Sequence, residues 1–201
     1  MFSTRALYFI TSFGDQAVIL PFAAAVAIML AAANARRTTA VWCLALGVSW
    51  AGAFVAKLIF LSCGHLLPDL DVRSPSGHTA AAVAAYGGFA ALWARRSEGR
   101  WTRALFIAGA LVACGAIALS RVLLHMHSLA EVTLGTLIGL AAPVILYRSK
   151  STATEPHSRP TLFLLLLPLC LIFLLHGATM PIEGLIGRMS RALTALFGIC
   201  P

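Results

Sequence analysis

The sequence carries little charge for its length, and acidic residues are especially few. Of its 201 residues, 11% are Asp, Glu, Lys or Arg, and only seven are acidic. A typical soluble domain is about 25% charged and about 45–50% apolar, whereas this chain is 60% apolar with a mean hydropathy of +0.89. These proportions exclude disorder, a coiled coil and a water-soluble globule. So short a chain cannot hide this many apolar residues in its own interior, and the bilayer is their expected solvent.

Further absences exclude other classes of protein. The cations stand in short groups and form no basic stripe with interleaved aromatic residues, which excludes nucleic acid as a partner despite a formal charge of +8. The five cysteines include no CxxC pair and no Cys/His spacing typical of zinc sites, so we expect neither a metal nor another cofactor. A disulfide between Cys63 and Cys200 is left open. No repeat or linker is evident, which predicts a single domain over residues 1–201.

Long apolar runs are what the sequence does contain. Six of them are candidate transmembrane helices, at 15–33, 39–63, 77–94, 104–119, 131–147 and 161–177. Shorter amphipathic segments precede and follow them, at 1–14 and 181–197, and their pattern is typical of helices that lie on the membrane interface. The expected fold is therefore all-α: a polytopic membrane protein with a bundle of six transmembrane helices and interfacial terminal helices. The oligomeric state is left open.

The distribution of cations predicts the orientation of this bundle. Three loops alternate with the apolar runs so that all of them lie on one side of the membrane, at 34–38, 95–103 and 148–160. Together they hold nine of the fifteen Lys and Arg residues. Cytoplasmic loops carry an excess of positive charge, so this side is expected to face the cytoplasm. The first run is followed rather than preceded by basic residues, which distinguishes it from a secretory signal. We therefore expect a multi-pass protein of the inner (plasma) membrane, with both termini outside.

Several polar side chains gather at the outer face, where a membrane protein should have a reason for them. Because the chain enters the membrane through the third run and returns through the fourth, residues 78 and 120 must lie at the same face. The candidate site residues are Lys57 in the second run, Arg73, Ser76, Gly77 and His78 at the start of the third, Arg121 at the end of the fourth, and His127 and Glu131 before the fifth.

Part of this cluster suits the binding of phosphate. Lys57, Arg121 and Arg73 are fixed cations of the kind that hold multiply charged anions. Ser76 and Gly77 stand at the expected start of a helix, where free backbone N–H groups and the positive end of the helix dipole attract phosphate. The cluster therefore predicts a phosphate site at the outer membrane face.

The remaining residues suit phosphoryl transfer. His127 and Glu131 are four residues apart, so they share one face of a helix. The carboxylate can accept the proton-bearing ring nitrogen, which fixes the tautomer and leaves the other nitrogen as a nucleophile. His78 comes from a different helix and can protonate the leaving oxygen. These residues predict transfer through a phosphohistidine without a metal.

Two motifs resemble those of the type 2 phosphatidic acid phosphatase superfamily. Pro75-Ser76-Gly77-His78 matches the PSGH motif of that family. Ser120-Arg121, followed after five residues by His127 and after three more by Glu131, is similar to its SRxxxxxHxxxD motif. Both motifs occur in the right order and are separated by one pair of apolar runs.

The sequence departs from the family pattern in two places. Lys57 stands where the upstream KxxxxxxRP motif has its lysine, but Gly64-His65 occupy the positions of Arg and Pro. Arg73 is the nearest replacement for that arginine. Glu131 is one methylene longer than the Asp of the second motif, which would displace the imidazole by about an ångström, and such a shift can cost on the order of a hundredfold in rate.

The resemblance implies a fold and a function. It implies a helical bundle whose active site lies near the periplasmic or lumenal surface, and a lipid phosphatase acting on undecaprenyl diphosphate, phosphatidylglycerophosphate, phosphatidic acid or lipid A. In it, His127 would be the nucleophile, Glu131 its orienting acid and His78 the general acid, with Lys57, Arg121, Ser76 and Gly77 holding the phosphate. The alternatives are a lipid phosphotransferase or a non-catalytic component that binds phosphate lipids. A transporter is disfavoured because no second, inward-facing charged cluster is present.

Overall fold

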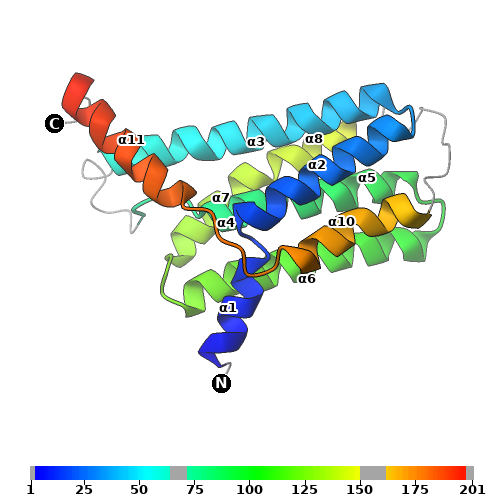
Figure 1. Ribbon diagram of the computed structural model, residues 1–201, viewed down its shortest axis with the longest axis horizontal. Coiled ribbons are helices and arrows are strands. Elements are labelled where there is room, and N and C mark those ends of the chain that lie inside the picture. Colours follow the sequence, from blue (N-terminus) through cyan, green and yellow to red (C-terminus); the bar gives the residue numbers. More distant parts are fainter. Residues whose placement is uncertain (1–2, 64–71, 150–161, 198–201) are drawn as a thin grey trace.

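The computed structural model describes residues 3–63, 72–149 and 162–197, and all regular structure in these ranges is helical. Most of the helices lie side by side in an elongated bundle, with α1 crossing one end and α11 extending beyond it along α3 (Figure 1). The elements are α1 (Thr4–Ser12), α2 (Gln16–Ala32), α3 (Arg36–Cys63), α4 (Gly77–Ala82), the π-helix η2 (Val83–Gly87), α5 (Gly88–Arg96), α6 (Arg100–Leu123), α7 (Leu129–Gly139), α8 (Ala141–Arg148), α10 (Leu162–Leu174) and α11 (Ile182–Phe197).

The all-α fold expected from the sequence is confirmed for the described residues, but the six-span count stays a prediction. In the described ranges, four helical runs are long and apolar enough to cross a membrane: Thr4–Ala32, Arg36–Cys63, Arg100–Leu123 and Leu129–Arg148. The run expected at 77–94 is helical throughout, as α4, η2 and α5 in succession, and α10 covers most of the run expected at 161–177. The segment expected as an N-terminal interfacial helix forms α1, which packs against α6.

Three helices at the same end of the bundle start at side-chain caps. Asp15 accepts a hydrogen bond from the backbone N–H of Ala17 at the start of α2, and Ser76 caps α4. Ser128 and Glu131 form a capping box at the start of α7. Because a cap satisfies N–H groups that a helix start would otherwise leave unpaired, these residues fix where each helix begins and bring its first turn to this end.

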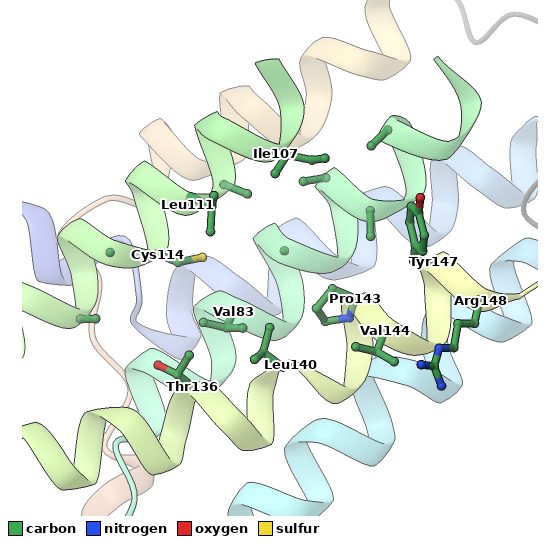
Figure 2. A pocket seen from close by; sticks show the side chains of 17 residues that line it. Val83, Ile107, Leu111, Cys114, Thr136, Leu140, Pro143, Val144, Tyr147 and Arg148 are labelled. Atoms are coloured by element: carbon green, nitrogen blue, oxygen red, sulfur yellow. The ribbon is translucent and has the colours of Figure 1, made fainter. Parts of the chain in front are cut away.

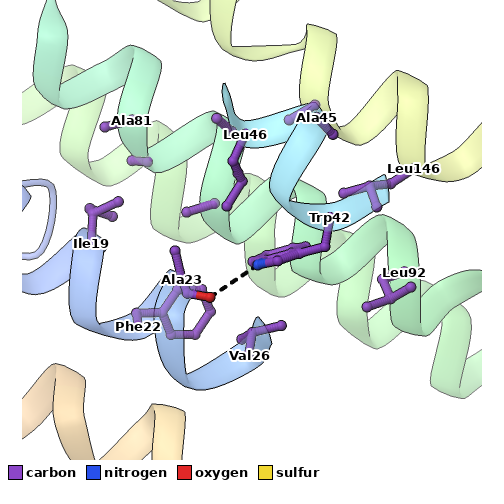
Figure 3. Close-up of a cluster of buried hydrophobic side chains, with 14 of the residues drawn as sticks. Ile19, Phe22, Ala23, Val26, Trp42, Ala45, Leu46, Ala81, Leu92 and Leu146 are labelled. Carbon is purple, nitrogen blue, oxygen red and sulfur yellow. Dashed lines mark hydrogen bonds between the residues drawn. The ribbon is translucent and has the colours of Figure 1, made fainter. Parts of the chain in front are cut away.

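A buried indole lies at the centre of the apolar core. Trp42 of α3 is fully enclosed, and its ring N–H donates a hydrogen bond of 3.0 Å to the carbonyl oxygen of Ala23 on α2 (Figure 3). An indole N–H that is buried without a partner costs about 1–3 kcal/mol, so this bond stabilises the contact between α2 and α3. Around this bond pack the side chains of Ile19, Phe22, Leu46, Leu92 and Leu146. The core thus joins α2, α3, α5 and α8.

Two glycines bring α7 unusually close to α4. A Cβ atom at Gly135 would lie 2.5 Å from the carbonyl oxygen of Ser76, and one at Gly139 would lie 2.7 Å from that of Ala80. Glycines four residues apart are a common device for close helix packing in membranes. The contact is continued by the N–H of Ser76, which donates to the carbonyl oxygen of Glu131 at 3.0 Å. It places the start of α4 against the start of α7.

One disulfide occurs near the same end of the bundle. Cys63, the last residue of α3, is disulfide-bonded, whereas Cys43, Cys114 and Cys170 are free thiols. Cys200, the partner considered from the sequence, lies outside the described residues.

The turns that join α2 to α3 and α5 to α6 lie at the opposite end of the bundle (Figure 1). Two of the three basic loops expected in the cytoplasm therefore lie far from the end at which α2, α4 and α7 begin. This arrangement agrees with the predicted orientation.

Candidate active site

His127 and Glu131 are paired as the sequence predicts, but they do not share one face of a helix, because α7 begins at Leu129 and His127 lies before its capping residue Ser128. His127 Nδ1 lies 2.6 Å from Glu131 Oε2, and both side chains are 7% exposed. Glu131 also accepts backbone N–H groups, from Arg73 at 2.7 Å and Ser74 at 2.9 Å on Oε1 and from Ser128 at 3.2 Å on Oε2. The extra methylene therefore does not separate the carboxylate from the imidazole. It lets one carboxylate bind the histidine and the backbone before α4 together.

The second nitrogen of His127 is left free for chemistry. Because Glu131 accepts the hydrogen on Nδ1, Nε2 carries the lone pair. Nε2 is buried and has no hydrogen-bond partner among the described residues. Burial lowers the pKa of His127, and the positive charge of Arg121 adds to this, outweighing the opposite effect of Glu131. The imidazole is therefore neutral at neutral pH, as a nucleophile must be.

Two buried cations face the space beside this histidine. Lys57 of α3 and Arg121 of the last turn of α6 are 5% and 6% exposed. Arg121 donates to the hydroxyl of Thr11 at 3.4 Å, while its Nε atom is buried without a partner in the part of the chain that the structure describes. A buried charge is costly unless an anion compensates it. Glu183 compensates Lys57 at 3.1 Å, and the role of both cations in holding phosphate oxygens stays a prediction.

His78 has a carboxylate partner of its own, which the sequence reasoning missed. His78 Nε2 lies 3.5 Å from Asp15 Oδ2, and Asp15 is buried. The other oxygen of Asp15 caps α2 and accepts the N–H of Met180 at 3.1 Å. Asp15 thus relates to His78 as Glu131 relates to His127. An available signal was that Asp15 is one of only seven acidic residues and begins an apolar run at the face of the site.

The start of α4 contributes in two ways. The hydroxyl of Ser76 is turned into the helix cap, accepting the hydroxyl hydrogen of Thr79 at 3.0 Å, so its direct role in phosphate binding stays a prediction. Gly77 opens the space in front of Lys57: a Cβ atom there would lie 3.2 Å from Lys57 Cε and 3.5 Å from Nζ. The missing side chain leaves room for a ligand at the ammonium group.

Arg73 enters the site through its backbone. Its N–H donates to Glu131, as described above, while its side chain is exposed. Its proposed role as a substitute for the motif arginine stays a prediction. Gly64 and His65, which stand at the motif positions themselves, lie outside the described residues.

A second residue that the sequence reasoning missed is Glu183 of α11. Its Oε1 atom lies 3.1 Å from Lys57 Nζ and 4.0 Å from both His78 Nδ1 and His127 Nε2. Burial opposes its ionisation, but the charges of Lys57, His78 and Arg121 outweigh this and lower the pKa of Glu183. The amphipathic pattern of 181–197 predicts this helix but gives no sign that its first turn reaches the site.

Several apolar cavities lie among the described helices, and a small one reaches the site. A cavity of ≈190 Å³ between α2, α3 and α11 ends at Lys57, Gly77 and Glu183, and its other lining is mainly apolar, including Trp50 and Phe54. A cavity of ≈690 Å³ lies between η2, α5, α6, α7 and α8 and extends to Tyr147 and Arg148 (Figure 2). The site histidines do not line this second cavity. Of the two, only the smaller one is therefore continuous with the candidate site.

Comparison with known proteins defines the family. Residues 61–155 match the model of the PAP2 superfamily. The chain is also 31% identical over 193 residues to the "Uncharacterized 22.5 kDa protein in cps region" of Klebsiella pneumoniae, covering 93% of this chain and 91% of that one. The chain belongs to the PAP2 superfamily. No solved structure gives a significant match.

Family membership confirms the resemblance seen in the motifs and supports a phosphatase-type activity on lipid phosphates in general. The matched stretch contains both histidines, Glu131 and Arg121. Asp15 and Glu183 lie outside it and reach the same site through α2 and α11. Tertiary packing, rather than the two motifs, brings them to the site.

Proposed function

We propose that the protein is an integral membrane phosphatase that hydrolyses a phosphate monoester or diphosphate of a membrane lipid through a phosphohistidine. The observation that carries this proposal is the Nε2 atom of His127, which is buried and unpartnered among the described residues, and which faces the same small space as Lys57. The site thus combines a neutral nucleophile with fixed positive charge, which is the combination that phosphoryl transfer requires.

In the first step, His127 Nε2 attacks the phosphorus atom. The bond from phosphorus to the lipid oxygen breaks, the electron pair leaves with that oxygen, and His78 donates a proton to it. Lys57 and Arg121 stabilise the negative charge of the phosphoryl oxygens, and Glu131 stabilises the positive charge that develops on the His127 ring. The products of this step are a phosphohistidine and the lipid with one phosphate fewer, which is an alcohol from a monoester and a monophosphate from a diphosphate.

In the second step, water attacks the phosphohistidine. His78, now neutral, accepts a proton from the water, the bond between phosphorus and Nε2 breaks, and inorganic phosphate is released. Asp15 faces the same ring of His78 and stabilises its charged form in each round. Because Lys57 and Arg121 supply the positive charge, no step needs a metal, and we expect activity in the presence of a chelator.

The apolar cavity at Lys57 supports a lipid as the substrate. Its position between α2, α3 and α11 lets a hydrocarbon chain lie among apolar side chains while the phosphate meets the cations. Undecaprenyl diphosphate, phosphatidylglycerophosphate, phosphatidic acid and lipid A are the substrates we propose to test.

The site is proposed to face the periplasm or exterior from the inner membrane. The basic turns at the opposite end of the bundle support this orientation through the positive-inside rule. The disulfide at Cys63 supports it independently, because disulfides persist in oxidising compartments.

The test is phosphate release from these four lipids by the detergent-solubilised protein in the presence of EDTA. We expect His127→Ala to abolish release. The matched control is His125→Asn, because His125 is exposed in the same loop and has a φ of 54° that Asn tolerates. Release that survives His127→Ala would refute the mechanism. Lipid binding without turnover across the panel would instead identify a non-catalytic component, and transfer of phosphate to an added alcohol in preference to water would identify a phosphotransferase.

A further inference from the structure

We propose that Glu183 is an internal substitute for the substrate's phosphate: its carboxylate occupies the phosphate site when no ligand is bound, and the substrate must displace it. This inference rests on the proposed function, because it assumes that phosphate binds between Lys57 and the two histidines. Glu183, from α11, would then compete with the substrate and determine which ligands bind at the phosphate site.

The contacts of Glu183 are those expected of a phosphoryl oxygen. A single atom, Oε1, lies 3.1 Å from Lys57 Nζ and 4.0 Å from the free nitrogen of each histidine. His78 Nδ1 and His127 Nε2 are both buried and unpartnered within the described ranges. Three groups that the mechanism directs at phosphate therefore converge on one carboxylate oxygen.

The carboxylate and a substrate phosphate cannot occupy the site together. Attack requires the phosphorus atom to lie about 3–3.5 Å from the nucleophilic nitrogen. Glu183 Oε1 already stands 4.0 Å from His127 Nε2, which is where the oxygens around such a phosphorus atom would be. Two negative groups at this distance would also repel each other. Substrate entry therefore requires Glu183 to leave Lys57.

Glu183 is the side chain of the site that can leave. Its side chain is 44% exposed, whereas the side chains of Lys57 and His127 are each 7% exposed. The body of α11 is fixed further along, where Ile186 and Ser190 are buried and Ser190 shares a hydrogen bond of 2.9 Å with Ser62 of α3. Rotation of the Glu183 side chain toward the exposed side frees the site while α11 stays in place.

This competition favours ligands with more negative charge. Glu183 brings one negative charge to Lys57, Arg121 and His78, whereas a phosphate monoester or a diphosphate brings two or more. Such a ligand gains more from the same cations than it loses by releasing Glu183. A phosphodiester carries a single charge and has no such advantage. Glu183 is thus a specificity-determining residue for terminal phosphate groups.

The test compares Glu183→Gln with Glu98→Gln, which makes the same chemical change at an exposed residue in the turn between α5 and α6, at the opposite end of the bundle. Binding of inorganic phosphate to the detergent-solubilised protein is measured by calorimetry. We expect Glu183→Gln to tighten binding about fivefold, the upper range for a partly exposed ion pair, and Glu98→Gln to leave it unchanged. Glu183→Asp keeps the charge but shortens the reach and should tighten it less than Glu183→Gln.

Turnover of the lipid substrate separates competition from a direct role in chemistry. We expect Glu183→Gln to lower KM without lowering kcat. Unchanged or weaker phosphate binding in Glu183→Gln would overturn the inference, and so would a fall in kcat with KM unchanged, which would make Glu183 a base in the reaction. The calorimetric result does not depend on turnover, so a protein that binds phosphate competitively but hydrolyses no lipid would refute the proposed function alone.

Discussion

Shortening Glu131 to Asp tests whether the carboxylate is fitted to this particular backbone. The family motif has Asp at this position, so a simple expectation from the motif is that Glu131→Asp would be harmless or beneficial. The structure predicts the opposite, because four donors surround the longer side chain: the imidazole of His127 and the backbone N–H groups of Arg73, Ser74 and Ser128.

The expected magnitude follows from the geometry. Removing one methylene withdraws the carboxylate by about 1.5 Å. If the backbone stays in place, the distance of 2.6 Å to His127 Nδ1 lengthens to roughly 4 Å, beyond hydrogen-bond reach. A misplacement of this size costs on the order of a hundredfold in rate. Each buried N–H group left unpaired costs a further ~1–3 kcal/mol of stability.

The assay is kcat on the best lipid substrate together with the thermal unfolding midpoint, for wild type and Glu131→Asp. We expect kcat to fall about a hundredfold and the midpoint to fall as well. Glu131→Gln is the companion variant, because it keeps the length but loses the charge that stabilises the His127 ring. A rate for Glu131→Asp equal to or above that of wild type would refute the reasoning, since it would mean that the segment before α4 moves freely with the carboxylate.

Three further predictions follow from the same structure. Asp15→Asn removes the charge beside His78 and should slow release of the lipid product in the first turnover by about tenfold to a hundredfold, part of what acid catalysis contributes. The first-turnover release of phenol from an aryl phosphate should barely change, because that leaving group needs no proton; equal losses in the first turnover of both substrates would contradict the role of Asp15. The lowered pKa of His127 keeps the ring neutral down to mildly acidic pH, so kcat/KM should fall as the pH decreases through a value below the usual 6.5. If the midpoint of this fall in the pH profile lies above 6.5, burial does not control the pKa of His127. Gly139→Ala places a methyl group 2.7 Å from a carbonyl oxygen of α4 and should destabilise the protein by about 1–3 kcal/mol. Gly47→Ala is the control, because nothing lies within 4 Å of a methyl group there, and it should not destabilise the protein. Similar unfolding midpoints for the two variants would refute the close packing of α7 against α4.

The two histidines of the site are supported in parallel ways. Glu131, in the first turn of α7, binds His127, which lies just before that helix. Asp15, at the start of α2, faces His78. The first pair is local in the sequence and therefore appears as a motif. The second joins residues 63 positions apart, because α2 and α4 start at the same end of the bundle. Helix caps thus serve both to start the helices and to place the acids.

Motif spacing was enough to predict that His127 and Glu131 pair, but not how they do so. The predicted shared helix face is wrong, because α7 begins at Leu129 and Glu131 reaches back from its first turn to His127, which lies before the capping residue Ser128. The membrane class was equally secure, because an apolar excess of this size has no place in a small soluble interior. The effect of the longer carboxylate was not predictable from the spacing. It depends on the backbone of Arg73 and Ser74, which only the packing of α4 against α7 brings within reach.

The membrane class, the family and the candidate residues of the two motifs could be read from the sequence, because apolar excess and short-range spacing are local properties of the chain. Asp15 and Glu183 join the site through tertiary packing alone. Along the chain, Asp15 is accounted for as the cap of α2 and Glu183 as part of the polar face of α11. Neither position by itself indicates a role in catalysis. Their roles arise because the ends of α2, α3, α4 and α11 meet in one place, and that meeting is set by packing rather than by any pattern along the chain.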